Sequence, residues 1–331
     1  MKSLVRRTVA AALGAAALSL APPGDAEAQQ RYFLNIGTAG VGGGYYPAGG
    51  YICAALNRTR ERLRHNIRCT VEATAGSVAN MRAIRNGDLE VAFAQSDWQY
   101  HAYGGSSVFQ DSGPNRDLRF LFSLQFDPFH MVVRPGVSVN SFQNLRGKVV
   151  NTGNVGSGHE STLRMLFGRY GIDPAQFFSQ EGKLTSREQG AALCDNKLDA
   201  FLFPAGMGAA SISEATNTCG ARVVPWDDAT IQKLVQDLPY FAMVTIPPGI
   251  YRGHTEGVRT WGVQATLVGT TRLPEEVAYV MAKSVFDSFD EFTAQSPIFT
   301  GITRETAARA GQSAPYHPGT LRYFREVALV Q

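Results

Sequence analysis

Sequence patterns that mark hydrolases, nucleotide sites and zinc sites are absent from this chain of 331 residues. It has no G-x-S-x-G around a serine nucleophile and no G-x-x-x-x-G-K-[S/T] loop for a phosphate. Its six histidines include no H-E-x-x-H pattern. Its four cysteines include no C-x-x-C, so we do not expect a zinc site. The sequence therefore predicts a protein that is not an enzyme and that holds no metal and no cofactor.

The chain also lacks a strong charge of either sign. Lys and Arg number 31, Asp and Glu number 28, and the formal net charge is +3. No block of basic residues stands out, so the electrostatic footprint of a nucleic-acid partner is missing. Beyond the N-terminus there is no long uncharged apolar run, and we expect no direct insertion into a membrane.

The N-terminus has the three parts of a secretory signal peptide. Lys2, Arg6 and Arg7 precede an uncharged apolar run from 8 to 21, and a small-x-small pattern ends at Ala28. The run is too short for a membrane anchor. We expect cleavage after Ala28 and a periplasmic location. Removal of 28 residues leaves 303, a length natural for two lobes.

The four cysteines are an even number in an exported chain, which indicates disulfides. Cys53, Cys69, Cys194 and Cys219 allow three pairings. The local pairing, Cys53 with Cys69 and Cys194 with Cys219, places one bridge in each half of the chain. We favour that pairing over the two others.

In the first half, predicted strands run into polar loops and then helices. The strands cover 32–37, 67–73 and 89–94. This order is typical of a parallel α/β sheet with crossover helices. Such sheets bind ligands at the carboxyl ends of their strands. The loops at those ends are 37–44, 74–77 and 95–97.

The second half repeats this layout. A strand at 148–151 leads through the glycine-rich loop 152–158 into a helix, and a strand at 198–203 ends in the turn 203–208. Between the halves, the apolar segment 118–133 could be two strands that carry the chain across. We expect the helical C-terminal region to pack on the first lobe. The predicted divisions are a signal peptide at 1–28, a first lobe of 29–122 and 255–331, and a second lobe of 123–254.

The loops of both halves could bind an anion, because backbone N–H groups and the positive ends of helices gather there. The loop 74–77 has a hydroxyl at each end, and Gln95 and Asp97 add an amide and a carboxylate. Taken alone, Asp97 is more typical of a helix cap. From the second half, Ser157 faces these groups, and His159 could also reach a ligand.

Several short motifs follow one another along the chain. They are NIGTA at 35–39, YYPAG at 45–49, TAGSVAN at 74–80, VAFAQSD at 91–97, LDAF at 198–201, IPPGIY at 246–251 and HPG at 317–319. Each is short, but together they are specific. Over residues 32–326 the chain resembles the TAXI family, the solute receptors of TRAP transporters.

The resemblance implies a type II periplasmic-binding-protein fold, in which two α/β lobes joined by a hinge close on a ligand. It implies a small carboxylate or acidic amino acid as solute, such as glutamate or 2-oxoglutarate, and delivery to the membrane subunits of a TRAP transporter. We expect a monomer. The ligand-binding residues that it implies are Thr38, Tyr46, Thr74, Ser77, Gln95, Gly156, Ser157 and Gly158, to which we add Asp97 and Pro204 from their positions at strand ends.

One departure from the family pattern affects the ligand. Many relatives carry a G-H-P-type sequence after the strand that ends near residue 203, whereas this chain continues Pro204-Ala205-Gly206-Met207. This difference leaves the solute open. Two other functions also remain: a periplasmic enzyme on the same fold that uses Ser157 or His159, and a sensory partner that presents its ligand to a signalling protein.

Overall fold

The computed structural model describes residues 31–331, and the predicted signal peptide with its cleavage site lies outside the described residues. The strands are β1 (Tyr32–Gly37), β2 (Ile67–Glu72), β3 (Val91–Gln95), β4 (Leu118–Val133), β5 (Val149–Asn151), β6 (Gln180–Gly182), β7 (Ala200–Pro204), β8 (Arg222–Val224), β9 (Phe241–Ile246) and β10 (Val258–Thr270). The α-helices are α1 (Tyr45–Leu63), α2 (Ser77–Asn86), α3 (Ser96–Gly104), α4 (Gly158–Tyr170), α5 (Pro174–Phe177), α6 (Gln189–Cys194), α7 (Ala210–Cys219), α8 (Ala229–Asp237), α9 (Glu275–Phe286), α10 (Phe289–Thr293), α11 (Arg304–Arg309) and α12 (Pro318–Glu326). None of the described helices is long and apolar enough to cross a membrane.

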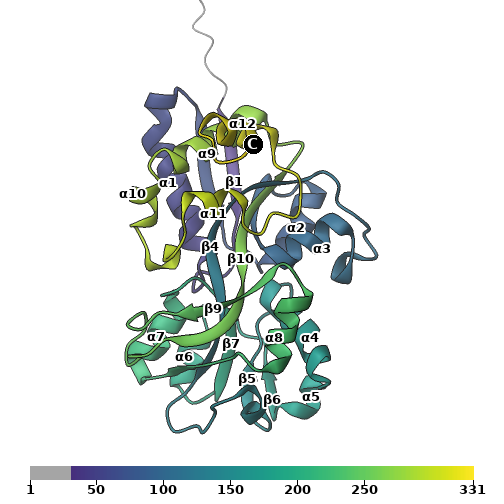
Figure 1. Cartoon of the computed structure of the whole chain (residues 1–331), viewed down its shortest axis with the longest axis vertical. Helices are drawn as coiled ribbons and strands as arrows, with labels where there is room; N and C mark the ends of the chain where they lie inside the picture. The colour runs from purple at the N-terminus through teal and green to yellow at the C-terminus, as the bar shows by residue number, and fades with distance from the viewer. Residues whose placement is uncertain (1–30) are drawn as a thin grey trace, which may run out of the picture. The chain divides into compact units, whose positions relative to one another are not determined.

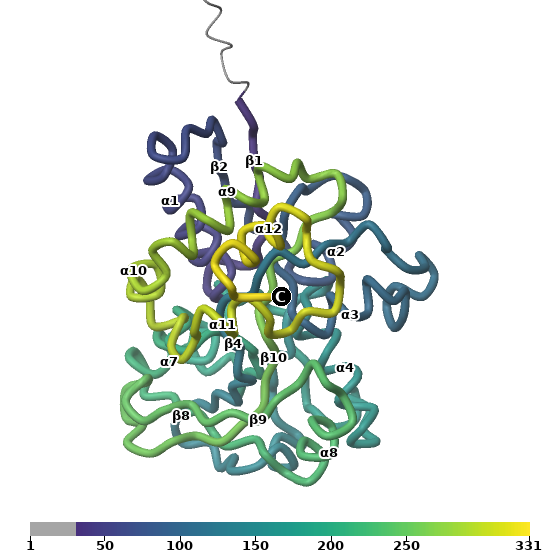
Figure 2. The backbone as a smooth tube through the Cα atoms, turned by 45° about the horizontal axis from the view of Figure 1, so that its top comes forward, coloured from purple at the N-terminus to yellow at the C-terminus, as the bar shows by residue number. Residues whose placement is uncertain are grey.

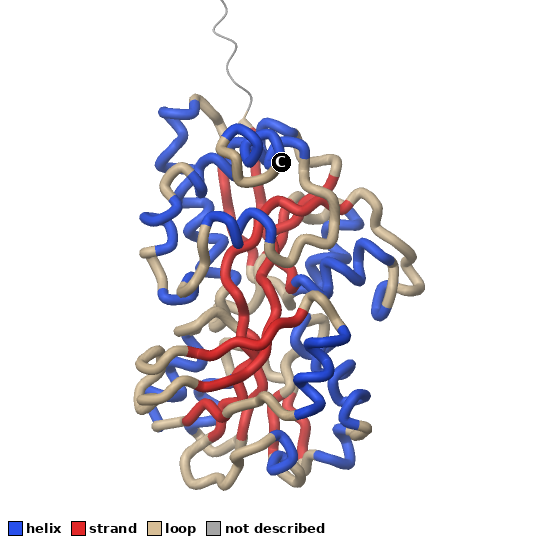
Figure 3. The backbone as a smooth tube through the Cα atoms, in the orientation of Figure 1, coloured by secondary structure: helices blue, strands red, loops and turns tan. Residues whose placement is uncertain are grey.

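Two long strands, β4 and β10, connect two sheets that are flanked by helices (Figures 1 and 3). The strand order is β2-β1-β3-β10-β4 in the first sheet and β4-β7-β5-β6 in the second. β1 runs parallel to β2 and β3, and β5 runs parallel to β6 and β7. β4 and β10 are antiparallel to each other. The α/β, two-lobed fold class predicted from the sequence is therefore confirmed.

The segment 118–133 is one strand and not two. β4 pairs with β10 as far as Pro128 and with β7 from Phe129 onward, so the chain passes from one sheet into the other without a break. Gly262 of β10 lies opposite Pro128, and a Cβ at Gly262 would come within 2.3 Å of the Asp127 carbonyl oxygen. The two strands can approach this closely because residue 262 has no side chain.

We define lobe 1 as β1–β3, α1–α3 and α9–α12, and lobe 2 as β5–β9 and α4–α8; β4 and β10 belong to both. Residues 31–331 together make one compact unit. The predicted boundary at 122/123 lies inside β4, and that at 254/255 lies shortly before β10. Both boundaries stay predictions.

The C-terminal helices complete the core of lobe 1, as predicted (Figure 2). Leu34 of β1 shares a buried cluster with Val280 of α9 and Phe324 of α12. Between α1 and α9 the hydroxyls of Thr59 and Ser284 make a buried 2.6 Å hydrogen bond. The core of lobe 2 is built separately, from residues between 129 and 263.

Two disulfides cross-link the described chain. Cys53 of α1 bonds to Cys69 of β2, and Cys194 of α6 bonds to Cys219 of α7. This is the local pairing favoured from the sequence. Each bridge joins two elements of the same lobe, so neither ties the lobes together.

Candidate functional site

A cavity with about 470 Å³ of space not filled by atoms lies where the two lobes meet. It is lined from lobe 1 by the first glycine-rich loop, the start of α1, the start of α2 and the end of β3. Lobe 2 contributes the loop before α4, the end of β7 and Ser186, and β4 contributes Asp127. The lining residues are Ala39, Gly40, Gly43, Gly44, Tyr45, Ala75, Gly76, Ser77, Gln95, Asp127, Asn154, Ser157, Gly158, His159, Ser186, Phe203, Pro204 and Ala205.

Two helices of lobe 1 begin at the cavity without a side-chain cap. The N-cap residues of α1 and α2 are Gly44 and Gly76, and neither end receives a capping hydrogen bond from a side chain. The amino end of an uncapped helix presents N–H donors and partial positive charge. α4 begins on the opposite wall, but Ser157 caps it by accepting a hydrogen bond from Glu160 N. The lobe 1 wall therefore favours negatively charged or acceptor groups.

Hydrogen bonds to backbone carbonyls join the lobes around the cavity. Asn154 Nδ2 donates to Ala75 O at 3.0 Å, and Ala79 N donates to Gly156 O at 3.1 Å. The lobes in this structure are thus in direct contact, and the cavity between them stays partly open to solvent.

A buried side-chain network, the cross-lobe latch, joins α3 of lobe 1 to α4 of lobe 2. It consists of Asp97, Trp98, Thr162 and the carbonyl of Gly158. The Thr162 hydroxyl donates to Asp97 Oδ2 at 2.6 Å, and Trp98 Nε1 donates to Gly158 O at 2.8 Å. Burial raises the pKa of Asp97 to about 7, although the hydrogen bond from Thr162 acts in the opposite direction. Asp97 therefore contacts the other lobe, not the cavity.

Several polar atoms of the cavity region are buried and have no hydrogen-bond partner among the described residues. They are Tyr45 Oη, Gln125 Nε2 and Oε1, Asp127 Oδ1, His159 Nε2 and Ser186 Oγ. Buried polar atoms are rarely left unpaired, because each loses its contact with water and gains nothing in return. These atoms around one cavity are available to pair with polar groups of a bound molecule or with water.

His159, the one histidine among these residues, is uncharged at neutral pH. Burial lowers the pKa of His159 to about 3, and the charge of Lys183 acts in the same direction. Its ring lies against Phe203 and over Gly153, where a Cβ would be only 1.6 Å from His159 Nε2. At neutral pH, His159 therefore offers the cavity one uncharged ring nitrogen.

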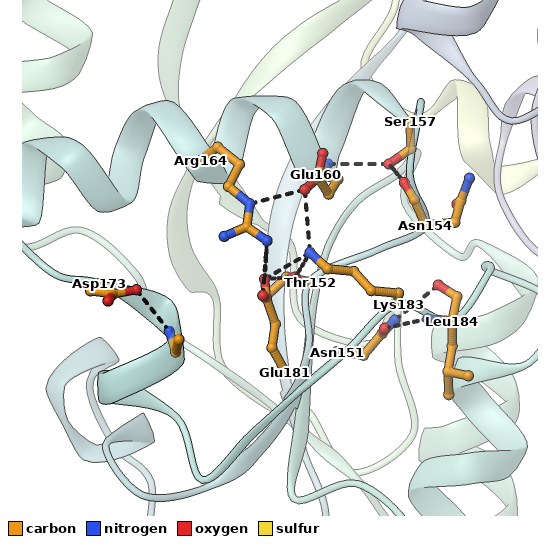
Figure 4. A network of polar contacts seen from close by, with 11 residues as sticks. Asn151, Thr152, Asn154, Ser157, Glu160, Arg164, Asp173, Glu181, Lys183 and Leu184 are labelled. Atoms are coloured by element: carbon orange, nitrogen blue, oxygen red, sulfur yellow. Dashed lines mark hydrogen bonds and ion pairs between the residues drawn. The ribbon is translucent and has the colours of Figure 1, made fainter.

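The nearby lysine is already paired within lobe 2 (Figure 4). Lys183 Nζ lies 2.8 Å from Glu181 Oε1 and 3.2 Å from Glu160 Oε1. Arg164 contacts the same two carboxylates. The described residues that line the cavity include no Lys and no Arg.

Five of the residues predicted to bind ligand line the cavity: Ser77, Gln95, Ser157, Gly158 and Pro204. Four of them, all but Pro204, are also engaged in side-chain or latch hydrogen bonds within the protein. Ser77 Oγ accepts from Gln95 N, and the Ser157 hydroxyl donates to Asn154 O. A role for Ser157 as a nucleophile gains no support from this geometry, because its oxygen already caps α4.

The other five predicted residues do not line the cavity. The Thr38 hydroxyl donates to Glu72 O at 2.6 Å, and the Thr74 hydroxyl donates to Thr38 O at 2.8 Å, so both fix the loops behind the site. Tyr46 is half-buried on α1, whereas its neighbour Tyr45 lines the cavity. Asp97 belongs to the latch, and Gly156 to the backbone contact between lobes.

Sequence reasoning missed several lining residues, chiefly Asp127, Asn154, Ser186 and Phe203. A signal for Asp127 was present, since polar residues interrupt the otherwise apolar segment 118–133. Ser186 comes from a loop with no glycine-rich or capping pattern, and the sequence offers no comparable signal for it. No group of three or more His, Cys, Asp or Glu residues within 31–331 is placed to hold a metal ion.

A family model described as the NMT1-like family matches residues 36–327, most of the chain. The chain belongs to the NMT1-like family. Solved structures also resemble this NMT1-like protein. The aliphatic sulphonate binding protein SsuA from Escherichia coli is 14% identical, with 89% of this chain and 84% of that chain covered and a TM-score of 0.46. A putative L-cystine ABC transporter protein from Listeria monocytogenes is 13% identical, with 82% and 96% covered and a TM-score of 0.49.

Proposed function

We propose that this protein is an extracytoplasmic solute receptor that binds a small polar or anionic solute between its lobes and delivers it to a membrane permease. The observation that carries the proposal is the cavity between the lobes, whose walls come from both lobes and hold unpaired buried polar atoms. In an open form, water would reach these atoms. A solute that pairs with them favours the closed form, since a ligand shifts an equilibrium toward the state that it binds better.

The solute binds in the cavity between the two lobes. The permease is of the TRAP type, which the resemblance to the TAXI family implies. With the TRAP permease reconstituted in vesicles, uptake is expected to follow an ion gradient. Uptake that required ATP would contradict the TRAP partner but not the receptor.

The direct test is thermal unfolding of the mature protein with a panel of small solutes that includes carboxylates, amino acids, sulfonates and sugars. At a concentration of 100 times Kd, a ligand of the folded state adds about 2.7 kcal/mol, which raises Tm by about 4 °C in a chain of this size. A panel without any shift, together with no copurified solute in native mass spectrometry, would count against the receptor.

The cross-lobe latch gives a further prediction. Thr162→Val keeps the shape of the side chain but removes the hydroxyl that donates to Asp97 Oδ2. Asp97 Oδ2 then lacks a partner in the closed form, although Trp98 N still donates to Oδ1, and an unpaired buried acceptor costs about 1–3 kcal/mol. We expect solute affinity, measured by calorimetry, to fall about tenfold or more.

Thr216→Val is the matched control for this variant. Thr216 is equally buried, but its hydroxyl donates to Ser213 O of the same helix, within lobe 2. This substitution is expected to leave solute affinity nearly unchanged. Equal losses of affinity in both variants would show that the latch has no special part in closure.

A further inference from the structure

The hinge side of the cavity contains a buried carboxylate that faces no positive charge of the described residues. Asp127 lies on β4, next to the point where this strand passes from one sheet into the other. Its side chain lines the cavity, the residue is 2% exposed, and Oδ1 has no hydrogen-bond partner among the described residues. An ionised carboxylate buried in this way is unfavourable unless a cation or hydrogen-bond donors face it.

Two further unpaired side chains stand beside Asp127. The Tyr45 hydroxyl lies near Asp127: after burial, the charge of Asp127 is the main cause of the raised Tyr45 pKa, and an interaction of hydrogen-bond type between the two side chains adds to it. No hydrogen bond of normal length and angle joins them, so the hydroxyl can still turn toward a ligand. The Tyr45 ring stacks on Phe93 with centroids 5.0 Å apart, so its hydroxyl is held in place. The Gln125 amide is also fully buried and unpaired. These three side chains form what we call the hinge-side pole.

The protein itself supplies no cation to this pole. No Lys or Arg lines the cavity in the described chain, and the nearest candidate of lobe 2, Lys183, is paired with Glu160 and Glu181. His159 is neutral near pH 7. Burial raises the pKa of Asp127 to about 7, although the interactions with Tyr45 and Gln125 act in the opposite direction, and no positive charge of the described chain faces the carboxyl group. The compensating group must then come from the solute or from a proton.

We propose that Asp127, flanked by Tyr45 and Gln125, receives a cationic N–H group of the solute, such as a protonated amine. This inference rests on the proposed receptor function and narrows its substrate class. Tyr45 and Gln125 have oxygen atoms that can accept the remaining N–H bonds of an ammonium group. The uncapped starts of α1 and α2 are suited to a negative group on the same molecule, so the solute carries charges of both signs.

A protonated Asp127 that donates to a neutral or anionic solute is the competing arrangement. The two arrangements predict different affinities for a pair of solutes that have the same carbon skeleton, one with an amine and the other with a carbonyl in its place. We choose pairs of amino acid and 2-oxo acid for this comparison: L-glutamate with 2-oxoglutarate, L-alanine with pyruvate, and L-valine with its 2-oxo acid. Binding is measured by calorimetry on the mature protein.

In the wild type, the amine member of a pair that binds is expected to bind about tenfold or more tightly than its oxo partner, as for a charge-assisted hydrogen bond. Asp127→Asn is isosteric and removes the charge. It should reduce amine affinity to that of the oxo acid and change oxo-acid affinity by less than about threefold. Asp111→Asn, at an exposed aspartate outside the cavity, should change neither.

Three results would overturn this inference while the receptor function stands: an oxo acid that binds as tightly as its amine partner, an unchanged amine preference in Asp127→Asn, or binding only by panel solutes that lack an N–H cation. If no solute of the whole panel binds, the receptor function itself fails. The wild-type comparison needs no variant, and Tyr45→Phe provides a second variant if Asp127→Asn does not fold. It is expected to weaken amine binding about threefold or more and oxo-acid binding less.

Discussion

Gly158→Ala is expected to weaken solute binding about 100-fold while the unliganded protein stays as stable as the wild type. Gly158 is the first residue of α4 in lobe 2, and it faces α2 and the end of β3 in lobe 1. A Cβ at this position would lie 2.1 Å from Gln95 Oε1 and 2.8 Å from Ser77 Cβ. The Gln95 amide can turn aside, but the Ser77 Cβ is fixed to its helix, so the lobes would have to separate.

The size of this effect follows from the cost of overpacking. A methyl group forced into a filled contact costs about 1–3 kcal/mol, and the upper part of that range corresponds to about 100-fold in Kd. The contact is present only when the lobes touch, so the open protein does not suffer from it. The measurements are calorimetric Kd values for a solute found in the panel and Tm without solute.

Gly168→Ala is the matched control because it lies in the same helix. No heavy atom lies within 4 Å of a Cβ at Gly168. Alanine is also the better helix former, so we expect a small gain in stability and an unchanged Kd. If Gly158→Ala bound the solute as tightly as Gly168→Ala does, contact between the lobes at Gly158 would not be required for capture.

Loss of the disulfides is expected to have the largest effect on stability. The bridge between Cys53 and Cys69 spans 16 residues, and that between Cys194 and Cys219 spans 25. Loops of this size restrict the unfolded chain enough for each bridge to contribute about 3 kcal/mol. Replacing either pair with serine should therefore lower the free energy of unfolding in urea by about that amount.

Solute affinity, unlike stability, is expected to be insensitive to the loss of a disulfide. Each bridge joins elements of one lobe, so its removal should leave Kd nearly unchanged at temperatures where the protein is folded. The two serine pairs serve as controls for each other, since one affects lobe 1 and the other lobe 2. Four free thiols in the unfolded, unreduced protein would disprove both bridges.

Much of the fold could be predicted because local patterns determine it. The strand, loop and helix units at β1, β2 and β3 follow directly from alternating apolar residues and the glycine-rich turns after them. The local disulfide pairing was also predictable. The path of β4 was not, because a strand that changes sheets near Pro128 has the same local pattern as two strands.

The candidate site was predicted less completely than the fold. Sequence places Thr38 and Thr74 in the right loops but does not tell where their hydroxyls point, and both bind backbone carbonyls instead of facing the cavity. Asp127 was missed because its place in the cavity depends on the meeting of two lobes. The alternation of residues along β4 shows which side chains share a face, but only the tertiary contacts determine which of the two faces lines a cavity.

The return of the C-terminal helices to lobe 1 sets an order of folding for a chain that emerges from its N-terminus onward. Lobe 2 draws its core from residues between 129 and 263, so it can fold once that stretch has emerged. The main core of lobe 1 joins Leu34 to Leu329, and it cannot close until almost the last residue is available. The apolar faces of β1 and α1 are therefore the part of the chain that remains without its partners longest. A chaperone that binds exposed apolar segments would have its longest contact with this N-terminal segment.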